Sequence, residues 1–262
     1  MFACVRRAVG KDEILASHRQ VVGRRILHYD ALESTNDAAK EFLDEDLEDG
    51  LVVWADRQAA GRGRHGRAWA SPPGGLYFSM VLRPPSADAQ VLGLVMGLPL
   101  VQTLRHFGVL AGLKWPNDAV YQGRKIGGIL SEGVHRGGAF FVVVGVGVNT
   151  NVDLERLPPD VREKATTMKR EVSLFVANED FLDYYLGKAD EWYSRYRHTP
   201  SPFLVREVRG QCVTIGKRVS VESPRGRIVG RGHDLAPSGA LIVIDDSGTR
   251  HEILDGTVEH LT

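Results

Sequence analysis

Residues 51–80 read "LVVWADRQAAGRGRHGRAWASPPGGLYFSM", a loop rich in glycine and arginine between two apolar runs. The runs at 51–57 and 75–83 have the length and composition of strands. Gly61, Gly63 and Gly66 match the letters of the dinucleotide fingerprint, but that fingerprint opens a helix, whereas prolines, glycines and a second strand follow here. The stretch therefore excludes a dinucleotide-binding unit and predicts a strand–loop–strand unit.

The same loop has the chemistry of an anion-binding segment. Its glycines let backbone N–H groups approach a ligand, and Arg62, Arg64 and Arg67 offer planar, permanently charged donors for phosphate or carboxylate. An anionic small molecule or a nucleic-acid backbone would suit it. A solvated surface loop is the alternative, because charged loops are usually just surface.

The composition predicts a soluble protein with a substantial core. The 262 residues are 43% hydrophobic, and 33 Lys and Arg balance 33 Asp and Glu, so net charge gives no reason to expect a polyanionic partner. Cys4 and Cys212 lie far apart without metal-ligand spacing, which fits a reducing cytoplasm. Because neither a signal peptide nor an apolar run of membrane-spanning length is present, we expect a cytoplasmic protein without a membrane partner.

The remaining patterns predict an α/β fold with a small β-rich end. Apolar runs predict strands at 112–121, 125–134 and 139–149, which with the two above form one central sheet. Helical periodicity at 88–107 and 179–197 predicts helices that cover one sheet face, and a further helix is capped near Ser34 or Thr35. After 198–202, short runs separated by Gly, Pro and Asp predict a small β-barrel.

The stretch "LKWPNDAVYQGRKIGGIL" at 113–130 predicts a hairpin that reverses at 122–123. A two-residue turn pairs Val120 with Lys125 and Ala119 with Ile126. One sheet face then carries Asp118, Val120, Lys125 and Gly127. Lys125 would lie close enough to Asp118 for both to contact one ligand, although a solvent-exposed edge lysine is the simpler interpretation.

The strand "AFFVVVGVGVNTN" at 139–151 places glycine twice on one face. Strict alternation puts Gly145, Gly147 and Asn149 together, and the missing side chains leave a trough. Such glycines mark the close approach of a ligand or of a packing helix. Asn149 could present an amide to a purine edge.

Five motifs then resemble those of biotin protein ligases in order and spacing: "ESTN", "GRGRHGRAW", "KWPND", "KIGGIL" and "GVGVNTN". The resemblance covers residues 25–262 and leaves 1–24 as a short N-terminal extension. It implies a catalytic domain over 25–205 with a mixed sheet like that of class II synthetases, and an SH3-like barrel over 206–262. It also implies two reactions: biotin and MgATP give biotinyl-5′-AMP and pyrophosphate, and a carrier-domain lysine then takes the biotinyl group.

The resemblance also implies roles for individual residues, with Ser34, Thr35 and Gln58 on the ureido ring of biotin. The implied biotin site comprises Ser34, Thr35, Asn36, Gln58, Gly61, Arg62, Arg64, Trp69, Lys125, Gly127 and Gly147. The implied ATP site comprises Arg62, Arg64, Arg67, Trp69, Asn117, Lys125 and Asn149. The implied catalytic residues are Lys125, Arg62, Arg64 and Asp118, with Asp118 also a ligand of Mg²⁺.

The implied partner is a biotin carboxyl carrier domain of a carboxylase, and edge-to-edge pairing of sheets would make a homodimer. About two dozen residues before the catalytic domain are too few for a winged helix, so we expect no repressor role and no nucleic-acid partner. Three alternatives are open: a lipoate ligase or related acyl-adenylating transferase, a nucleic-acid-binding module built on the Gly/Arg loop, and a non-catalytic biotin-binding protein. A non-catalytic biotin-binding protein would give no role to Lys125 and the arginines.

Overall fold

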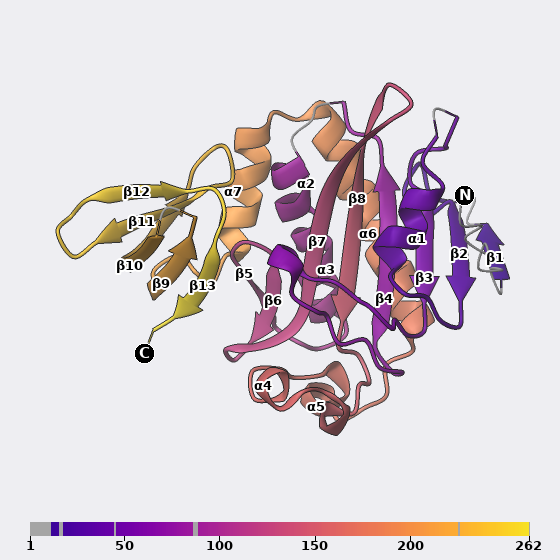
Figure 1. The fold of residues 1–262 in the computed structure, drawn as a ribbon, viewed down its shortest axis with the longest axis horizontal. Helices are drawn as coiled ribbons and strands as arrows, with labels where there is room; N and C mark the ends of the chain where they lie inside the picture. The colour runs from indigo at the N-terminus through magenta and orange to yellow at the C-terminus, as the bar shows by residue number, and fades with distance from the viewer. Residues whose placement is uncertain (1–11, 16–17, 45, 86–88, 225, 262) are drawn as a thin grey trace, which may run out of the picture.

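The computed structural model describes residues 12–15, 18–44, 46–85, 89–224 and 226–261, so Cys4 lies outside the described residues. An eight-stranded sheet forms the body of the molecule, in the order β1-β2-β3-β4-β8-β7-β6-β5 (Figure 1). Only β2 and β3 run parallel among these neighbours, so the mixed α/β sheet is confirmed. The strands are β1 Asp12–Leu15, β2 Arg25–Tyr29, β3 Val52–Ala55, β4 Leu76–Leu82, β5 Gly112–Lys114, β6 Asp118–Tyr121, β7 Arg124–Arg136 and β8 Ala139–Val148.

Four helices, α2 Ala89–Val95, α3 Gly97–His106, α6 Asn178–His198 and α7 Ser201–Gln211, lie together with the main core on one face of this sheet (Figure 1). Phe78 of β4 meets Tyr185 of α6 edge to face, and the Tyr185 hydroxyl donates to the Met96 carbonyl at 3.1 Å. The helix predicted at 88–107 is two helices, while the one at 179–197 is confirmed as α6. Helix α7 was not predicted, and the domain boundary expected at 205/206 falls inside it.

Helix α1, Thr35–Glu41, packs on the opposite face, whereas the helices predicted at 88–107 and 179–197 lie on one face as expected. Ser34 caps it as predicted, because its side chain accepts from the backbone N–H of Asp37 at 3.4 Å. Ala39 and Leu43 bury their side chains against Val53 and Phe141. The short α1 covers only part of this face, and the cleft described below lies beside its N-terminus.

The chain between β8 and α6 folds into short helical turns below the sheet (Figure 1). These are the 3₁₀ turn η2 Leu154–Arg156 and helices α4 Pro159–Arg162 and α5 Met168–Val172, none of which was predicted. The segment between α4 and α5 forms a bridge with β7: the Lys125 N–H donates to the Lys164 carbonyl at 2.8 Å, and the Thr166 N–H donates to the Lys125 carbonyl at 2.9 Å. Both backbone polar groups of Lys125, its N–H and its carbonyl, are thereby held by this segment.

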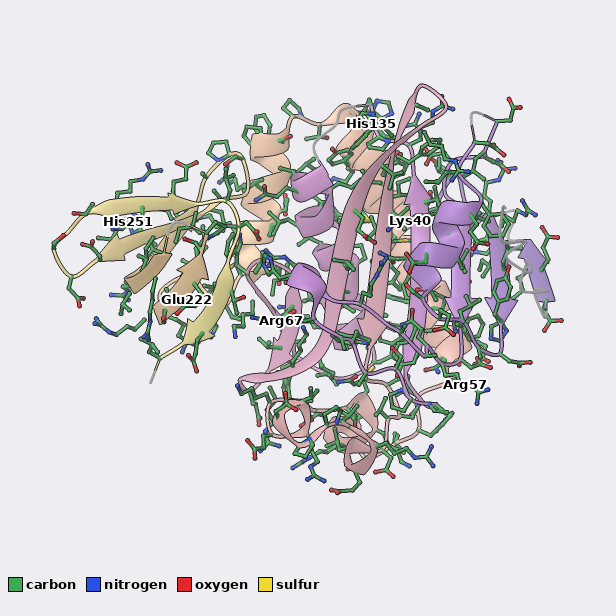
Figure 2. The ribbon with its side chains drawn as sticks, viewed as in Figure 1. Lys40, Arg57, Arg67, His135, Glu222 and His251 are labelled. Atoms are coloured by element: carbon green, nitrogen blue, oxygen red, sulfur yellow. The ribbon has the colours of Figure 1, made fainter. Side chains whose placement is uncertain are left out.

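A second, antiparallel sheet of five strands forms the C-terminal end, in the order β12-β11-β10-β9-β13. Its strands are β9 Arg218–Ser223, β10 Gly226–Leu235, β11 Leu241–Asp245, β12 Arg250–Ile253 and β13 Thr257–His260. The all-β end is therefore confirmed, and Glu222 and His251 mark it in Figure 2. The expected closed barrel is not confirmed, because β12 and β13 form two edges within the described part of the chain.

Residues 18–24, in the part predicted as an N-terminal extension, pack against α6. Val22 is buried in the main core, and the buried Arg19 contacts Asp183 of α6. One carboxylate of α6, Asp190, accepts three backbone N–H groups, from Gln20 at 2.7 Å and from Val21 and Val22 at 2.9 Å each. No helix among the described residues is both long and apolar enough to cross a membrane.

We expect Asp190→Ala to lower the free energy of unfolding by about 1–3 kcal/mol, because three backbone donors would lose one shared acceptor. Urea denaturation followed by far-UV circular dichroism measures this change. The neighbouring Glu191→Ala is the control, since Glu191 is exposed and pairs only with Lys188 among the described residues. Equal stabilities of the two variants would contradict the anchoring role of Asp190.

Candidate functional site

A cleft lies on the α1 face of the large sheet, where the Gly/Arg loop and the C-terminal sheet meet β6–β8. Segments far apart in the sequence build it, from the N-terminus of α1 to strand β13. Twelve of the expected site residues line it together: Ser34, Thr35, Asn36, Gln58, Arg62, Arg64, Arg67, Trp69, Asn117, Asp118, Lys125 and Gly147. The sequence motifs therefore converge on one place.

Three expected site residues lie outside this lining: Gly61, Gly127 and Asn149. Asn149 is buried, and its amide donates to the Thr166 carbonyl at 3.1 Å. At Gly61, a Cβ would come within 2.6 Å of the Ser71 hydroxyl, so this glycine permits close packing behind the loop.

The face expected for Gly127 is wrong because a β-bulge interrupts the hairpin. Val120 pairs with Lys125 as predicted, but Ala119 pairs with Gly127 instead of Ile126. The extra residue shifts the register. Gly127 consequently faces Leu100 in the core, and Gly128 lies beneath the cleft, where an added Cβ would meet the Lys125 side chain at 3.1 Å.

A buried polar network lies where α1 begins. Gln58 accepts through its Oε1 from the Thr35 N–H at 2.8 Å and from the Thr35 hydroxyl at 3.1 Å, and it donates to Ser71 at 2.8 Å. The Ser79 hydroxyl lies 2.7 Å from Thr35 Oγ1 and 2.6 Å from Asn36 Oδ1. These contacts hold an array of hydroxyls and amides in fixed orientations, which suits a small polar group such as a cyclic urea.

The predicted glycine trough in β8 is confirmed. An added Cβ would lie 2.1 Å from Asn36 Oδ1 at Gly145 and 2.5 Å from the Trp69 ring at Gly147. Both distances are too short for any side chain. The two glycines thus seat the Asn36 amide and the Trp69 ring directly on the sheet, between α1 and the loop.

Lys125 and Asp118 form an ion pair across the hairpin, with Nζ 2.5 Å from Oδ1. The same Nζ lies 4.9 Å from the centroid of the Trp69 ring. Both charged side chains are about a quarter to a third exposed, at 34% for Lys125 and 24% for Asp118, so they face the cleft rather than open solvent. The simpler interpretation, that Lys125 is a solvent-exposed edge lysine, is therefore wrong.

The Gly/Arg loop is a tight hairpin whose tip is the 3₁₀ turn η1, Arg64–Gly66. The Gly63 N–H donates to the Arg67 carbonyl at 2.7 Å, and the turn needs the positive φ of 71° that Gly66 adopts. Arg62 contacts Asp37 of α1, and Arg64 reaches the Asn117 side chain at 3.4 Å. Arg62 therefore points toward α1, whereas Arg64 and Arg67 reach the C-terminal sheet.

Burial lowers the pKa of the Arg64 guanidinium, an effect opposed by Asp118. Arg67, labelled in Figure 2, lies toward the C-terminal sheet and donates to Thr257 Oγ1 at 3.1 Å. Since a half-buried cation gains from an anionic neighbour, the loop is suited to a ligand carrying phosphate or carboxylate.

Sequence reasoning missed two charged residues of this region. Lys114, the first residue of "KWPND", lines the cleft, and burial lowers its pKa against the opposing effect of Asp118. Glu132 accepts from Asn36 at 2.6 Å and from Lys40 at 2.8 Å. Burial alone would raise the pKa of Glu132, but these hydrogen bonds and the nearby Arg62 lower it.

The C-terminal residues of the cleft were also missed: Gly256, Thr257 and Val258. The motif "KWPND" could have pointed to Lys114, because that motif was already assigned to the site. No local signal marks the C-terminal residues, since they meet the cleft only through packing of the second sheet on the first.

Comparisons with known proteins cover both the part of the chain that forms the large sheet and the C-terminal part. Residues 29–149 match the Biotin/lipoate A/B protein ligase family, and residues 214–261 match the Biotin protein ligase C terminal domain. A biotin–[acetyl-CoA-carboxylase] ligase of Mycobacterium tuberculosis is 34% identical over 225 residues, covering 81% of this chain and 80% of that protein. One from Paracoccus denitrificans is 31% identical over 212 residues, covering 75% and 85%. The solved structure of a biotin protein ligase from Aquifex aeolicus in complex with biotin and ATP has a TM-score of 0.80 at 27% identity, covering 90% of this chain and 99% of that one.

We expect Gly147→Ala to displace the Trp69 ring and to lower the free energy of unfolding by about 1–3 kcal/mol, as overpacking typically does. A changed tryptophan emission spectrum and a lower urea midpoint report the two effects. Gly187→Ala in α6 is the control, because an added Cβ there meets nothing within 4 Å. Wild-type fluorescence and stability in Gly147→Ala would show that the trough does not seat Trp69.

Proposed function

Because the chain belongs to the biotin protein ligase family, we propose that its cleft joins biotin to ATP and then hands the biotinyl group to a lysine of a carrier domain. The observation that carries this proposal is the convergence of Lys125, Arg62 and Arg64 on one cleft that also holds a rigid polar pocket. Biotin needs such a pocket at its ureido end and cations at its carboxylate end. ATP needs cations at its phosphates.

In the first reaction the substrate supplies its own nucleophile. A carboxylate oxygen of biotin attacks the α-phosphorus of ATP, the new P–O bond gives biotinyl-5′-AMP, and pyrophosphate leaves with the bonding electrons. Lys125 lies beside the place where the two anions meet, and it reduces their repulsion and stabilises the transferred charge. The protein therefore needs positioned cations rather than a serine or cysteine.

We place the ureido ring of biotin in the polar network of Thr35, Gln58 and Ser34. The support is its geometry: Gln58 and Thr35 fix each other, and Ser34 caps α1 beside them. Trp69, seated on Gly147, gives this pocket an apolar wall. The pyrophosphate end then falls toward the arginine loop and Lys114.

Magnesium fits the residues present if ATP supplies most of the ligands. No cluster of three or more His, Cys, Asp or Glu side chains that could hold a metal occurs among the described residues. Asp118 is a single carboxylate in the cleft, and Mg²⁺ is commonly held by one or two carboxylates together with substrate phosphates. Bound there, Mg²⁺ would neutralise charge on the phosphates, and Asp118 would hold it.

In the second reaction the amine of a carrier lysine attacks the carbonyl carbon of the adenylate. The C–N bond forms, AMP leaves, and the amine gives up a proton. We propose a carboxylase carrier domain as the partner.

We also propose a cytoplasmic location, which the presence of only two cysteines in the sequence supports. A homodimer paired through an outer strand of the large sheet is supported by β1, where Ile14 is 42% exposed at the sheet edge.

ATP–pyrophosphate exchange tests the function directly. We expect incorporation of labelled pyrophosphate into ATP only when biotin is added, because exchange requires reversible formation of biotinyl-5′-AMP. Lipoate is the matched alternative acid. Exchange with lipoate but not biotin, or with neither, would contradict the proposed function.

We expect Lys125→Ala to slow biotin-dependent exchange by about a hundredfold or more, which is typical for the loss of one well-placed charge donor. Its stability should stay near that of the wild type, since the side chain faces the cleft. Lys188→Ala is the control, because Lys188 pairs on the surface with Glu191. Near-normal exchange in folded Lys125→Ala would contradict the role assigned to Lys125.

We expect Arg64→Gly to separate the two reactions. Arg64 closes the tip of the loop over the cleft, so its loss should still allow the adenylate to form but let it escape. Since the escaped mixed anhydride acylates deprotonated amines, bystander biotinylation should increase as pH rises toward the lysine pKa of about 10.4. Streptavidin blotting of an added bystander protein measures this. Absence of adenylate, or delivery only to the carrier, would show that Arg64 does not retain the intermediate.

A further inference from the structure

The Gly/Arg loop is held by a turn of the C-terminal sheet nearly two hundred residues later in the chain. Arg64 pairs with Asp255 and donates to the Gly256 carbonyl at 3.3 Å. Arg67 donates to Thr257 Oγ1 at 3.1 Å. We call residues 254–257, the turn after β12 together with the first residue of β13, the clasp.

The clasp is itself fixed from two sides, by α2 and by β9. Gln90 of α2 donates to the Leu254 carbonyl at 2.7 Å. Thr257 pairs with Glu222 in the ladder between β13 and β9. At Gly256 a Cβ would come within 2.8 Å of the Glu222 carbonyl, so only glycine lets the turn lie this close to β9. The loop therefore rests on an anchored support.

The charges at this contact are arranged around Asp255. Arg64 lies against this carboxylate, and the His65 ring nitrogen lies 3.6 Å from it. The Arg64 side chain is 23% exposed and Asp255 is 48% exposed, which makes the pair half-buried at the rim of the cleft. Pairs of this exposure have modest strength, so an effect of about fivefold is expected rather than a loss of folding.

We propose that Asp255 is a positioning residue that holds Arg64, and with it the Gly/Arg loop, over the cleft, so that the C-terminal sheet retains biotinyl-5′-AMP. This inference rests on the proposed function. A guanidinium has five N–H donors, so binding to Asp255 leaves others for the anion in the cleft. Arg64 still lines the cleft and contacts Asn117 while it is paired, which fits support better than sequestration.

Limited proteolysis tests the clasp without using activity. Trypsin cleaves after arginine, and the loop offers Arg62, Arg64 and Arg67. We expect cleavage in Asp255→Ala to be about fivefold faster than in the wild type, as loss of a half-buried pair should increase loop opening. Asp246→Ala is the control, because Asp246 forms a similar pair with Arg218 on the same sheet, away from the cleft. Equal cleavage in Asp255→Ala and wild type would overturn the proposal.

Retention of the intermediate is the second readout. Enzyme carrying labelled biotinyl-5′-AMP is chased with unlabelled biotin and ATP, and release is followed by rapid filtration. We expect Asp255→Ala to release the adenylate about fivefold faster and Asp255→Asn, which keeps an acceptor, to fall between it and the wild type. Asp255→Ala should add nothing to the release expected of Arg64→Gly, because Asp255 acts through Arg64.

The outcomes separate the clasp from the proposed function. If the wild type forms no biotinyl-5′-AMP, the proposed function fails, while the tryptic result still decides whether the clasp holds the loop. Unchanged release in Asp255→Ala would overturn the retention role. Faster pyrophosphate exchange in Asp255→Ala without faster release would also overturn it, since Asp255 would then withhold Arg64 from ATP. Additive release in the double variant would show that Asp255 acts on another group.

Discussion

Electrostatic repulsion is the constraint that shapes this molecule. Two anionic substrates must meet, so five cations line one cleft: Arg62, Arg64, Arg67, Lys114 and Lys125. Those cations repel one another, and burial lowers the pKa of Arg64 and of Lys114. The fold places a carboxylate beside most of these cations. Asp37 and Glu132 lie beside Arg62, Asp255 lies beside Arg64, and Asp118 lies beside Lys125. The site is therefore a network of alternating charge, in which the substrates supply the missing anions.

The backbone makes room for this network. Gly145 and Gly147 let Asn36 and Trp69 rest on the sheet, and the bulge in the hairpin places Gly128 rather than Gly127 under Lys125 and Asp118. Hydrogen bonds from the segment between α4 and α5 fix the backbone of Lys125. Rigid support matters because a misplaced cation would favour neither the meeting of the anions nor the transferred charge.

Much of this arrangement could be predicted from the sequence, because it depends on short stretches of the chain. Alternation in the strand at 139–149 predicted the trough, and the resemblance to biotin protein ligases implied twelve of the lining residues. The bulge could not be predicted, since a single extra residue leaves the apolar pattern of β6 and β7 intact. The short helices α4 and α5 and the helix α7 were missed because their sequences lack a long periodic apolar stripe. Contacts of Gly256 and Thr257 depend on how the two sheets pack, which no local pattern encodes.

The contacts of Gly256 and Thr257, which the sequence did not predict, belong to the part of the site that must change during the reaction. An adenylate must be kept from water while it waits, yet a carrier lysine must later reach it. A loop fixed only by its own hairpin could not be opened from outside, whereas a loop held by another sheet can respond to whatever contacts that sheet. Since the clasp lies beside the cleft, a carrier that binds at the junction of the two sheets would touch both the bound intermediate and the turn that retains it. Retention and delivery would then depend on the same few contacts.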